Sequence, residues 1–264
     1  MAGVEFRLDR NRTAAALMAS RVVVVMTKDH VKTARHLVDT MWTVYQAGFV
    51  AEATMRIPEP IIRDAMPELI NLRQAELEKG KTFVLGVGSI TSDRDREVAA
   101  ELGFDMLDGP GKKIGQKTDP YEVLGKLQKM GYFLAPAAAT PSEFEDWLGP
   151  LFIPDAIKVY PADATKNLLP PCARPERQVI KVMPTGGVDD LTGPKQVKLI
   201  AKNGFIPMLG MSKPLEAVIK NQAPGDIPLI WRSIGDFIGS FLANNDQVPF
   251  GAIDQARFSL VCPG

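Results

Sequence analysis

The chain has 264 residues, of which 45% are hydrophobic and 23% are charged, and its 31 basic residues balance its 31 acidic residues. This composition is that of an ordinary globular protein, and the length suits one large α/β domain, so we expect residues 1–264 to form a single domain. A net charge near zero argues against a dedicated nucleic-acid surface, which needs an excess of Lys and Arg.

Eight short β-rich runs recur along the chain, with helical segments between them. They are residues 22–26, 49–54, 82–86, 104–107, 133–136, 156–160, 179–183 and 205–209. Strands that alternate with helices form a parallel sheet, because each helix returns the chain to the same edge, and eight such units can close into a barrel. We therefore predict an α/β fold, a (β/α)8 TIM barrel over about residues 20–222.

The helical segments carry start signals and apolar residues at helical spacing. Residues 1–20 predict a short helix in front of the barrel, and residues 29–47 predict a long helix on its wall. Residues 91–93 and 140–143 have the N-cap and first-turn residues of helix starts. Residues 227–242 predict an added C-terminal helix within an extension that covers 223–264.

Lys158 stands in the middle of an apolar strand pattern, between Ile157 and Val159. Because side chains alternate along a strand, the lysine faces the barrel interior if its neighbours face the helices. Burial lowers the pKa of an ammonium group, and a neutral amine can attack a carbonyl carbon to form a Schiff base. A lone lysine in a strand is more often a solvated edge residue or an ion-pair partner, and the strand pattern alone leaves that alternative open.

Polar residues gather at the ends of the predicted strands, where α/β barrels place their active sites. They are Glu52, Arg56, Ser89, Asp108, Lys158 and Thr185, followed by Gly186 and Gly187. Glu52 suits general acid–base work near a Schiff base, and Arg56 suits bidentate binding of a substrate carboxylate, to which Ser89 can add a hydrogen bond. Because Glu52 and Arg56 are four residues apart, an ordinary ion pair on a helix surface is the alternative.

Glycine-containing loops follow the seventh and eighth predicted strands. They contain Thr185, Gly186 and Gly187 in the first loop and Gly210, Met211 and Ser212 in the second. Loops at these two places commonly bind phosphate, because glycine lets backbone N–H groups approach the oxygens; two tight turns that need glycine are the alternative. The sequence has no dinucleotide-binding fingerprint and no cluster of metal-ligating residues, so we expect no cofactor and no metal.

Taken in order, these motifs resemble those of the 2-keto-3-deoxy-6-phosphogluconate and 4-hydroxy-2-oxoglutarate aldolases, class I enzymes built on a (β/α)8 barrel. The resemblance runs over about residues 22–215. It is carried by Glu-Ala-Thr-Met-Arg at 52–56, Gly-Val-Gly-Ser at 86–89, Thr-Pro-Ser-Glu at 140–143, Ile-Lys-Val-Tyr-Pro-Ala at 157–162 and Met-Pro-Thr-Gly-Gly-Val at 183–188. After the fourth strand, where the family usually has Ser-Pro-Gly, this chain has Asp108 followed by Gly-Pro-Gly.

The resemblance implies a role for each matching residue. Lys158 is the Schiff-base lysine, Glu52 is the acid and base, and Arg56 and Ser89 bind the carboxylate of pyruvate. Pro136, Tyr160 and Thr185 bind substrate, and Gly186, Gly187, Gly210, Met211 and Ser212 bind phosphate. The implied reaction is reversible cleavage of a 2-keto-3-deoxy sugar acid, phosphorylated at C6, or of an acid like 4-hydroxy-2-oxoglutarate, to pyruvate and an aldehyde, carried out by a homotrimer without a cofactor.

Two other functions fit the same residues. The first is a phosphosugar isomerase or epimerase on the same barrel, in which Glu52 moves protons and Lys158 acts only as a charge. The second is a barrel that binds a sugar acid without turnover.

The sequence also predicts where the protein works. Cys172 and Cys262 are too few for a disulfide framework, which favours a reducing compartment. Because the chain has neither an export signal nor an apolar run long enough to cross a bilayer, we expect a cytoplasmic protein that contacts small molecules and no membrane.

Overall fold

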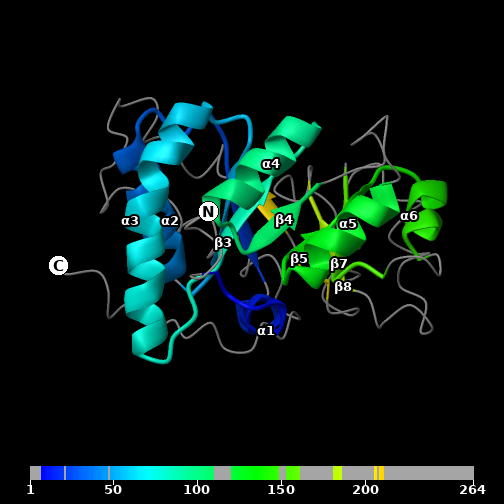
Figure 1. The fold of residues 1–264 in the computed structure, drawn as a ribbon, viewed down its shortest axis with the longest axis horizontal. Helices are drawn as coiled ribbons and strands as arrows, with labels where there is room; N and C mark the ends of the chain where they lie inside the picture. The colour runs from blue at the N-terminus through cyan, green and yellow to red at the C-terminus, as the bar shows by residue number, and fades with distance from the viewer. Residues whose placement is uncertain are drawn as a thin grey trace, which may run out of the picture.

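The computed structural model describes residues 7–20, 22–46, 48–109, 120–148, 153–160, 181–185, 205–206 and 208–210. The helices are α1 (Arg10–Ser20), α2 (Ala34–Gln46), α3 (Glu59–Glu78), α4 (Asp93–Leu102), α5 (Pro120–Lys129) and α6 (Pro141–Trp147). The strands are β1 (Val23–Met26), β2 (Val50–Thr54), β3 (Leu85–Gly88), β4 (Met106–Asp108), β5 (Phe133–Ala135), β6 (Ala137–Ala138), β7 (Ala156–Val159), β8 (Lys181–Pro184) and β9 (Met208–Gly210). Helices α2 and α3 lie on one flank of the strands, and α5 and α6 on the other (Figure 1).

The strands form one ring of parallel neighbours. Six of them pair in the order β5-β4-β3-β2-β1-β9, and three pair in the order β6-β7-β8. The two sheets meet at both ends, because β5 and β6 follow each other along the chain and a parallel bridge joins Thr185, just past β8, to Met208 in β9. Counting β5 and β6 as one interrupted strand, the ring has the eight members that define a (β/α)8 barrel.

Every predicted strand region contains a strand, and two of the differences in bounds have a visible cause. The third begins at Leu85 rather than at residue 82, because the backbone N–H of Leu85 donates to Asp105 Oδ2 (2.8 Å) and the ladder with β2 starts only there. The fifth is divided at Pro136, which has no N–H to give to a ladder. The Pro136 carbonyl still accepts a hydrogen bond from the backbone N–H of Lys158 (2.9 Å), so the ring stays joined at this point.

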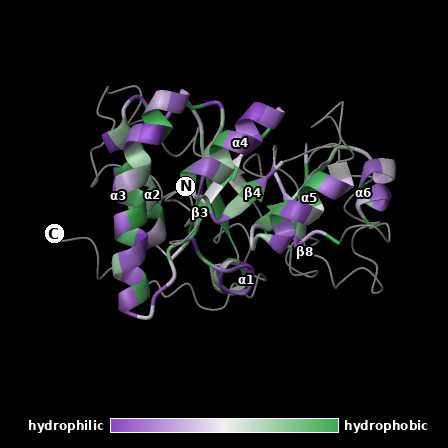
Figure 2. Cartoon of the chain, viewed as in Figure 1, coloured by the Kyte–Doolittle hydropathy of each residue, from purple (hydrophilic) through white to green (hydrophobic). Residues whose placement is uncertain are grey.

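Side chains alternate between two cores along the strands, as the period of two requires. One core lies inside the ring, and its buried strand residues include Val23, Val25, Val50, Met106, Phe133, Ala135, Ala156, Met183 and Met208. The other lies between the strands and the surrounding helices. The strands are drawn mainly in the hydrophobic colour, and the hydrophilic colour falls on helical turns (Figure 2).

The N-terminal segment closes the end of the ring at which the strands begin. Leu8 and Leu17 pack against the inner core, and the backbone N–H of Leu8 donates to Asp105 Oδ1 (2.7 Å). Arg73 Nη1 lies 2.6 Å from the same carboxylate oxygen, and both side chains are fully buried. Because apolar packing and a buried ion pair fill this end, the polar interior must lie toward the C-terminal ends of the strands.

The predicted helix starts at Ser92 and Thr140 are confirmed. Ser92 caps α4 in a capping box with Asp95, and Thr140 accepts a hydrogen bond from the backbone N–H of Glu143. The predicted helix over residues 29–47 begins later, at Ala34. It follows a turn in which the backbone N–H of Thr27 donates to His30 Nδ1 (3.0 Å). The predicted leading helix is α1, whereas the predicted helix over 227–242 lies outside the described residues.

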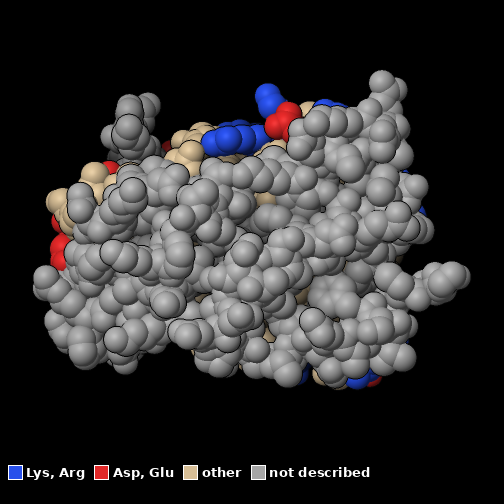
Figure 3. Space-filling view, turned by 180° about the vertical axis from the view of Figure 1, so that it is seen from behind, with Lys and Arg blue, Asp and Glu red and all other residues tan. Residues whose placement is uncertain are grey.

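Charges on the outer surface are mixed and often paired. Arg63 Nη1 lies 2.9 Å from Glu101 Oε1 and links α3 to α4. From behind, Lys and Arg lie next to Asp or Glu at the upper edge of the molecule (Figure 3). Within the described ranges, no helix has the length and apolar character needed to cross a membrane.

Candidate active site

Lys158 points into the ring from β7. Its neighbours Ile157 and Val159 belong to the outer core, so the alternation of the strand turns the lysine inward, as predicted. The residue is 8% exposed. A buried lysine inside the ring is not a solvated edge residue, which was one alternative left by the strand pattern. The other alternative, an ion-pair partner, is met, because Lys158 pairs with Glu52 and Asp108.

Two carboxyl groups meet the Lys158 ammonium group. Its Nζ donates a hydrogen bond to Asp108 Oδ2, from the last residue of β4, and lies 3.8 Å from Glu52 Oε1, in the middle of β2. Glu52 and Asp108 are both fully buried. The structure therefore brings Lys158 and Glu52 together as predicted, and adds Asp108, to which no chemical role had been assigned.

Gly88 makes room for this arrangement. It lies in β3, between the strands that carry Glu52 and Asp108. A Cβ atom at this position would lie 2.1 Å from Glu52 Oε1 and 3.0 Å from Asp108 Oδ2. The first of these distances is shorter than the contacts that real Cβ atoms make. The missing side chain lets two carboxyl groups from strands on either side of β3 approach each other.

The charge state of Lys158 follows from the balance of burial and its neighbours. Burial is the largest influence and lowers the pKa of Lys158, but the charges of Asp108 and Glu52 and the hydrogen bond to Asp108 together raise it above the ordinary value of 10.5. The prediction that burial leaves a neutral amine is therefore wrong in this arrangement. Lys158 rests as an ammonium ion and must lose a proton before it can act as a nucleophile.

Glu52 carries the opposite perturbation. Burial, followed by the negative charge of Asp108, raises the pKa of Glu52 well above the ordinary value of 4.5, although Lys158 acts to lower it. The surroundings of Glu52 therefore favour its protonated form more strongly than water does.

Several buried polar atoms of the site have hydrogen-bonding capacity that the described residues do not use. Glu52 Oε1 and Oε2, Asp108 Oδ1 and Thr54 Oγ1 are buried and have no hydrogen-bond partner among the residues that the structure describes. Thr54 lies two residues beyond Glu52 in β2 and so faces the same way. Thr54 had not been singled out as a site residue, although it lies within the motif at 52–56.

Arg56 and Ser89 lie above the buried charges, just past the ends of β2 and β3. The Arg56 side chain is exposed, and its positive charge is near enough to act on the pKa of Lys158, which it lowers. Ser89 is half-buried and has a φ of +56°, in the left-handed region that residues other than glycine rarely adopt. Such backbone strain concentrates at functional sites, which agrees with a binding role for Ser89.

The remaining predicted site residues divide into three groups. Pro136 and Thr185 are buried beside β7. The Pro136 carbonyl accepts a hydrogen bond from the backbone N–H of Lys158, and the backbone N–H of Thr185 donates to the Val159 carbonyl (2.9 Å). Tyr160 is 52% exposed, and Gly210 is aligned with Val25 in β1. Gly186, Gly187, Met211 and Ser212 lie outside the described residues, so their predicted phosphate binding stays a prediction. Among the described residues, no group of three or more His, Cys, Asp or Glu side chains is arranged to hold a metal.

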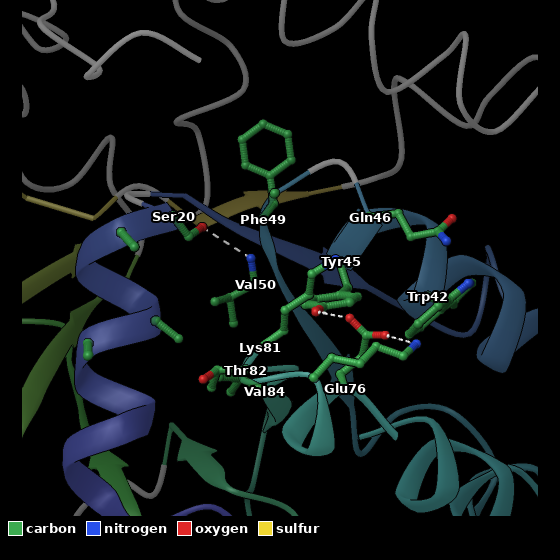
Figure 4. A pocket seen from close by; sticks show the side chains of 15 residues that line it. Ser20, Trp42, Tyr45, Gln46, Phe49, Val50, Glu76, Lys81, Thr82 and Val84 are labelled. Atoms are coloured by element: carbon green, nitrogen blue, oxygen red, sulfur yellow. Dashed lines mark hydrogen bonds and ion pairs between the residues drawn. The ribbon is translucent and has the colours of Figure 1, made fainter. Parts of the chain in front are cut away.

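A separate hollow of about 930 Å³ lies among α1, α2 and the start of β2. Figure 4 shows Trp42 and Tyr45 at this hollow, and Glu76 joined to Tyr45. The Tyr45 hydroxyl donates to Glu76 Oε2 (2.6 Å), and Lys79 Nζ lies 2.8 Å from Glu76 Oε1, so this carboxylate is satisfied. None of the predicted site residues that the structure describes lines the hollow, which lies at Val50, the first residue of β2, whereas Glu52 lies farther along this strand.

Comparisons with known proteins agree with the barrel. No family model and no curated protein matches the sequence. Among solved structures, the chain is similar to a KDPG aldolase from Legionella pneumophila, captured with pyruvate as a covalent carbinolamine intermediate, at 22% identity and a TM-score of 0.61, covering 83% of this chain and 95% of that chain. It is similar to 2-keto-3-deoxy-6-phospho-gluconate aldolase from Zymomonas mobilis at 17% identity and a TM-score of 0.56, covering 90% and 98%.

The same fold also occurs with other chemistry. The chain is similar to a tryptophan synthase alpha chain from Legionella pneumophila at 14% identity and a TM-score of 0.54, covering 88% of this chain and 98% of that chain. At these identities the comparisons establish the (β/α)8 fold, and a barrel alone does not select a reaction. The function must therefore be argued from Lys158 and the groups around it.

Proposed function

We propose that the protein is a class I aldolase that cleaves a 2-keto-3-deoxy sugar acid, phosphorylated at C6, or an acid like 4-hydroxy-2-oxoglutarate, reversibly to pyruvate and an aldehyde. The observation that carries the proposal is a buried lysine inside the C-terminal half of a (β/α)8 barrel, with Glu52 Oε1 3.8 Å from its Nζ. The motif resemblance in chain order and the aldolases among the similar structures support the same reaction.

Lys158 supplies the covalent step. Its amine, once deprotonated, adds to the C2 carbonyl of the keto acid, and loss of water leaves an iminium ion. This cation accepts the electron pair of the C3–C4 bond as that bond breaks. Glu52, in its carboxylate form, takes the proton of the C4 hydroxyl, which leaves as the aldehyde, and then returns a proton to C3 of the enamine. Hydrolysis of the imine releases pyruvate and restores Lys158.

The residues at the mouth position the two ends of the substrate. Arg56 and Ser89 bind the carboxylate next to the reacting carbonyl, and their place above the buried charges supports this role. Thr185 and Gly210 contact the chain of the sugar acid beyond C4. In this proposal the phosphate lies against the loops at 186–187 and 210–212, Pro136 and Tyr160 border the substrate, and no cofactor or metal takes part.

The charge state of Lys158 favours one rival, an isomerase or epimerase that uses the ammonium group only as a charge. The test is release of pyruvate from a panel of 2-keto-3-deoxy acids that includes both C4 epimers, each with and without a 6-phosphate. Coupling to lactate dehydrogenase reports pyruvate directly. The proposal expects release from at least one member and none from the Lys158→Met chain, whereas an isomerase or a pure binder releases no pyruvate from any of them.

We further propose that the enzyme acts in carbohydrate metabolism in the cytoplasm as a homotrimer. The support is the resemblance and the two cysteines, Cys172 and Cys262. Light scattering on the purified chain tests the assembly, since a trimer has three times the chain mass of 28.8 kDa and any other mass contradicts it.

A further inference from the structure

The Asp108 carboxylate is in direct contact with the Lys158 nitrogen, but the reaction proposed for Lys158 and Glu52 does not use it. We propose that Asp108 is a second catalytic carboxylate, which accepts a proton from the Lys158 ammonium ion before the imine forms and returns it to the departing oxygen. This inference rests on the proposed aldolase function and adds a residue to it. It also concerns a place where the sequence departs from the family pattern that it otherwise resembles.

The first argument is the geometry of the contact. Lys158 Nζ donates to Asp108 Oδ2, and Asp108 Oδ1 has no partner among the described residues although it is buried. A carboxylate with a purely structural role in a protein interior normally has its oxygens satisfied, as Asp105 does with Arg73 and two backbone N–H groups. The unused oxygen of Asp108 distinguishes it from such a structural carboxylate.

The second argument is the need for a base. An ammonium ion has no lone pair, so Lys158 cannot attack a carbonyl until a proton leaves its nitrogen. Because Lys158 is 8% exposed, bulk water has little access to take that proton. The acceptor must be a neighbouring group, and Asp108 is in hydrogen-bond contact, whereas Glu52 Oε1 is 3.8 Å away.

The proton transfers balance without any further reactant. Asp108 takes one proton from Lys158, and the resulting amine forms a bond to C2 while the C=O electron pair moves to oxygen. The second nitrogen proton passes to that oxygen, and Asp108 then gives back its proton as the C–O bond breaks and water leaves. The products are a protonated imine, one water molecule and the Asp108 carboxylate, which faces the new cation and stabilises it.

The two carboxyl groups also lie close to each other, because Gly88 has no side chain to separate them. Glu52 must be a carboxylate when the C4 hydroxyl loses its proton, yet burial and the charge of Asp108 raise the pKa of Glu52. Asp108 lies where it can accept the Glu52 proton, and that transfer frees Glu52 for this step.

The experiment measures how fast the imine forms, independently of C–C cleavage. The folded chain is mixed with pyruvate and quenched with borohydride at short times, and the reduced adduct is quantified by intact mass. Asp108→Asn keeps the size but removes the base, so we expect trapping about 100-fold slower, with a rate that rises with pH because solvent must take the proton. Asp108→Glu restores a carboxylate and should recover part of the rate.

A matched control is Glu76→Gln, which makes the same kind of change to a buried carboxylate at the opposite end of the barrel. Its trapping rate should equal that of the unmodified chain. If Asp108→Asn traps pyruvate as fast as the unmodified chain, with the same pH dependence, the Asp108 proposal is overturned while the aldolase proposal stands. If the unmodified chain traps no pyruvate, both proposals fall.

A measurement on the unmodified chain covers the case in which Asp108→Asn does not fold. With an internal acceptor, the trapping rate stays level between about pH 6 and about pH 9, because the resting state already contains both the ammonium ion and its base. A rate that climbs about tenfold for each pH unit over this range means that hydroxide removes the proton, and it would overturn the role of Asp108.

Discussion

Glu52→Gln should make the protein more stable while it removes the activity. The glutamine side chain has the shape and the neutral charge of protonated glutamic acid, and its amide can donate to Asp108 as that acid does. Glu52 is fully buried and lies next to a second carboxyl group, which raises its pKa well above 4.5 in the folded chain. The unfolded chain has no such neighbour, so Glu52 ionises there at its ordinary pKa.

The expected size of the effect follows from proton linkage. Below about pH 4.5 Glu52 is protonated in both states, and its pKa shift has no cost. As the pH rises, the unfolded chain releases this proton and the folded chain keeps it, which lowers the free energy of unfolding by about 1.4 kcal/mol for each pH unit. The cost grows until the pH reaches the raised pKa of Glu52 in the folded chain, and Glu52→Gln removes it.

The assay is urea unfolding of both chains at pH 5, 6 and 7. The free energy of unfolding of Glu52→Gln relative to the unmodified chain should rise by about 1.4 kcal/mol per pH unit. Pyruvate release should fall about 100-fold or more, because the proton acceptor is gone. A difference in the free energy of unfolding that does not change with pH would show that Glu52 is ionised in the folded chain, and would refute the raised pKa of Glu52.

Two further substitutions test the geometry of the site. Gly88→Ala places a Cβ atom 2.1 Å from Glu52 Oε1, so kcat/KM for pyruvate release should fall at least about 10-fold and Tm should drop. The control is Gly125→Ala, where the new Cβ atom has nothing within 4 Å, and it should leave kcat/KM unchanged and raise the free energy of unfolding by up to about 1 kcal/mol. Equal kcat/KM values of the two variants would contradict the crowding around Gly88. Arg56→Gln removes the proposed carboxylate ligand. Because a hydrogen bond to a charged group contributes about 1.5–3 kcal/mol, KM should rise about 10- to 100-fold, with a smaller change in kcat. An unchanged KM in steady-state assays would show that Arg56 does not bind the substrate.

The barrel and the direction of its key side chains could be predicted from local patterns. Period-two alternation was enough to place Lys158 inside the ring, because both of its neighbours are apolar. Capping residues marked helix starts at Ser92 and Thr140 for the same reason, since a cap depends only on the next few residues. The interruption at Pro136 was missed because it depends on hydrogen bonds to two different neighbouring strands.

The charge state of the site could not be predicted in this way. From the sequence, the visible influence on Lys158 was burial between apolar neighbours, which lowers its pKa. The opposing influence comes from Asp108, 50 residues earlier in the chain, whose contact with Lys158 depends on the register of the ring and on the open space at Gly88. Sequence patterns give the face on which a side chain lies, but not which charged groups from other strands meet it.

The covalent bond between Lys158 and the carbonyl carbon of a keto acid is the claim on which the proposed function depends. Borohydride reduction in the presence of pyruvate, followed by proteolysis and tandem mass spectrometry, locates that bond at a single residue. We predict one modified peptide, with the added mass of reduced pyruvate on Lys158. An adduct confined to another lysine, such as the half-buried Lys181 in β8, or no adduct at all, would contradict the account.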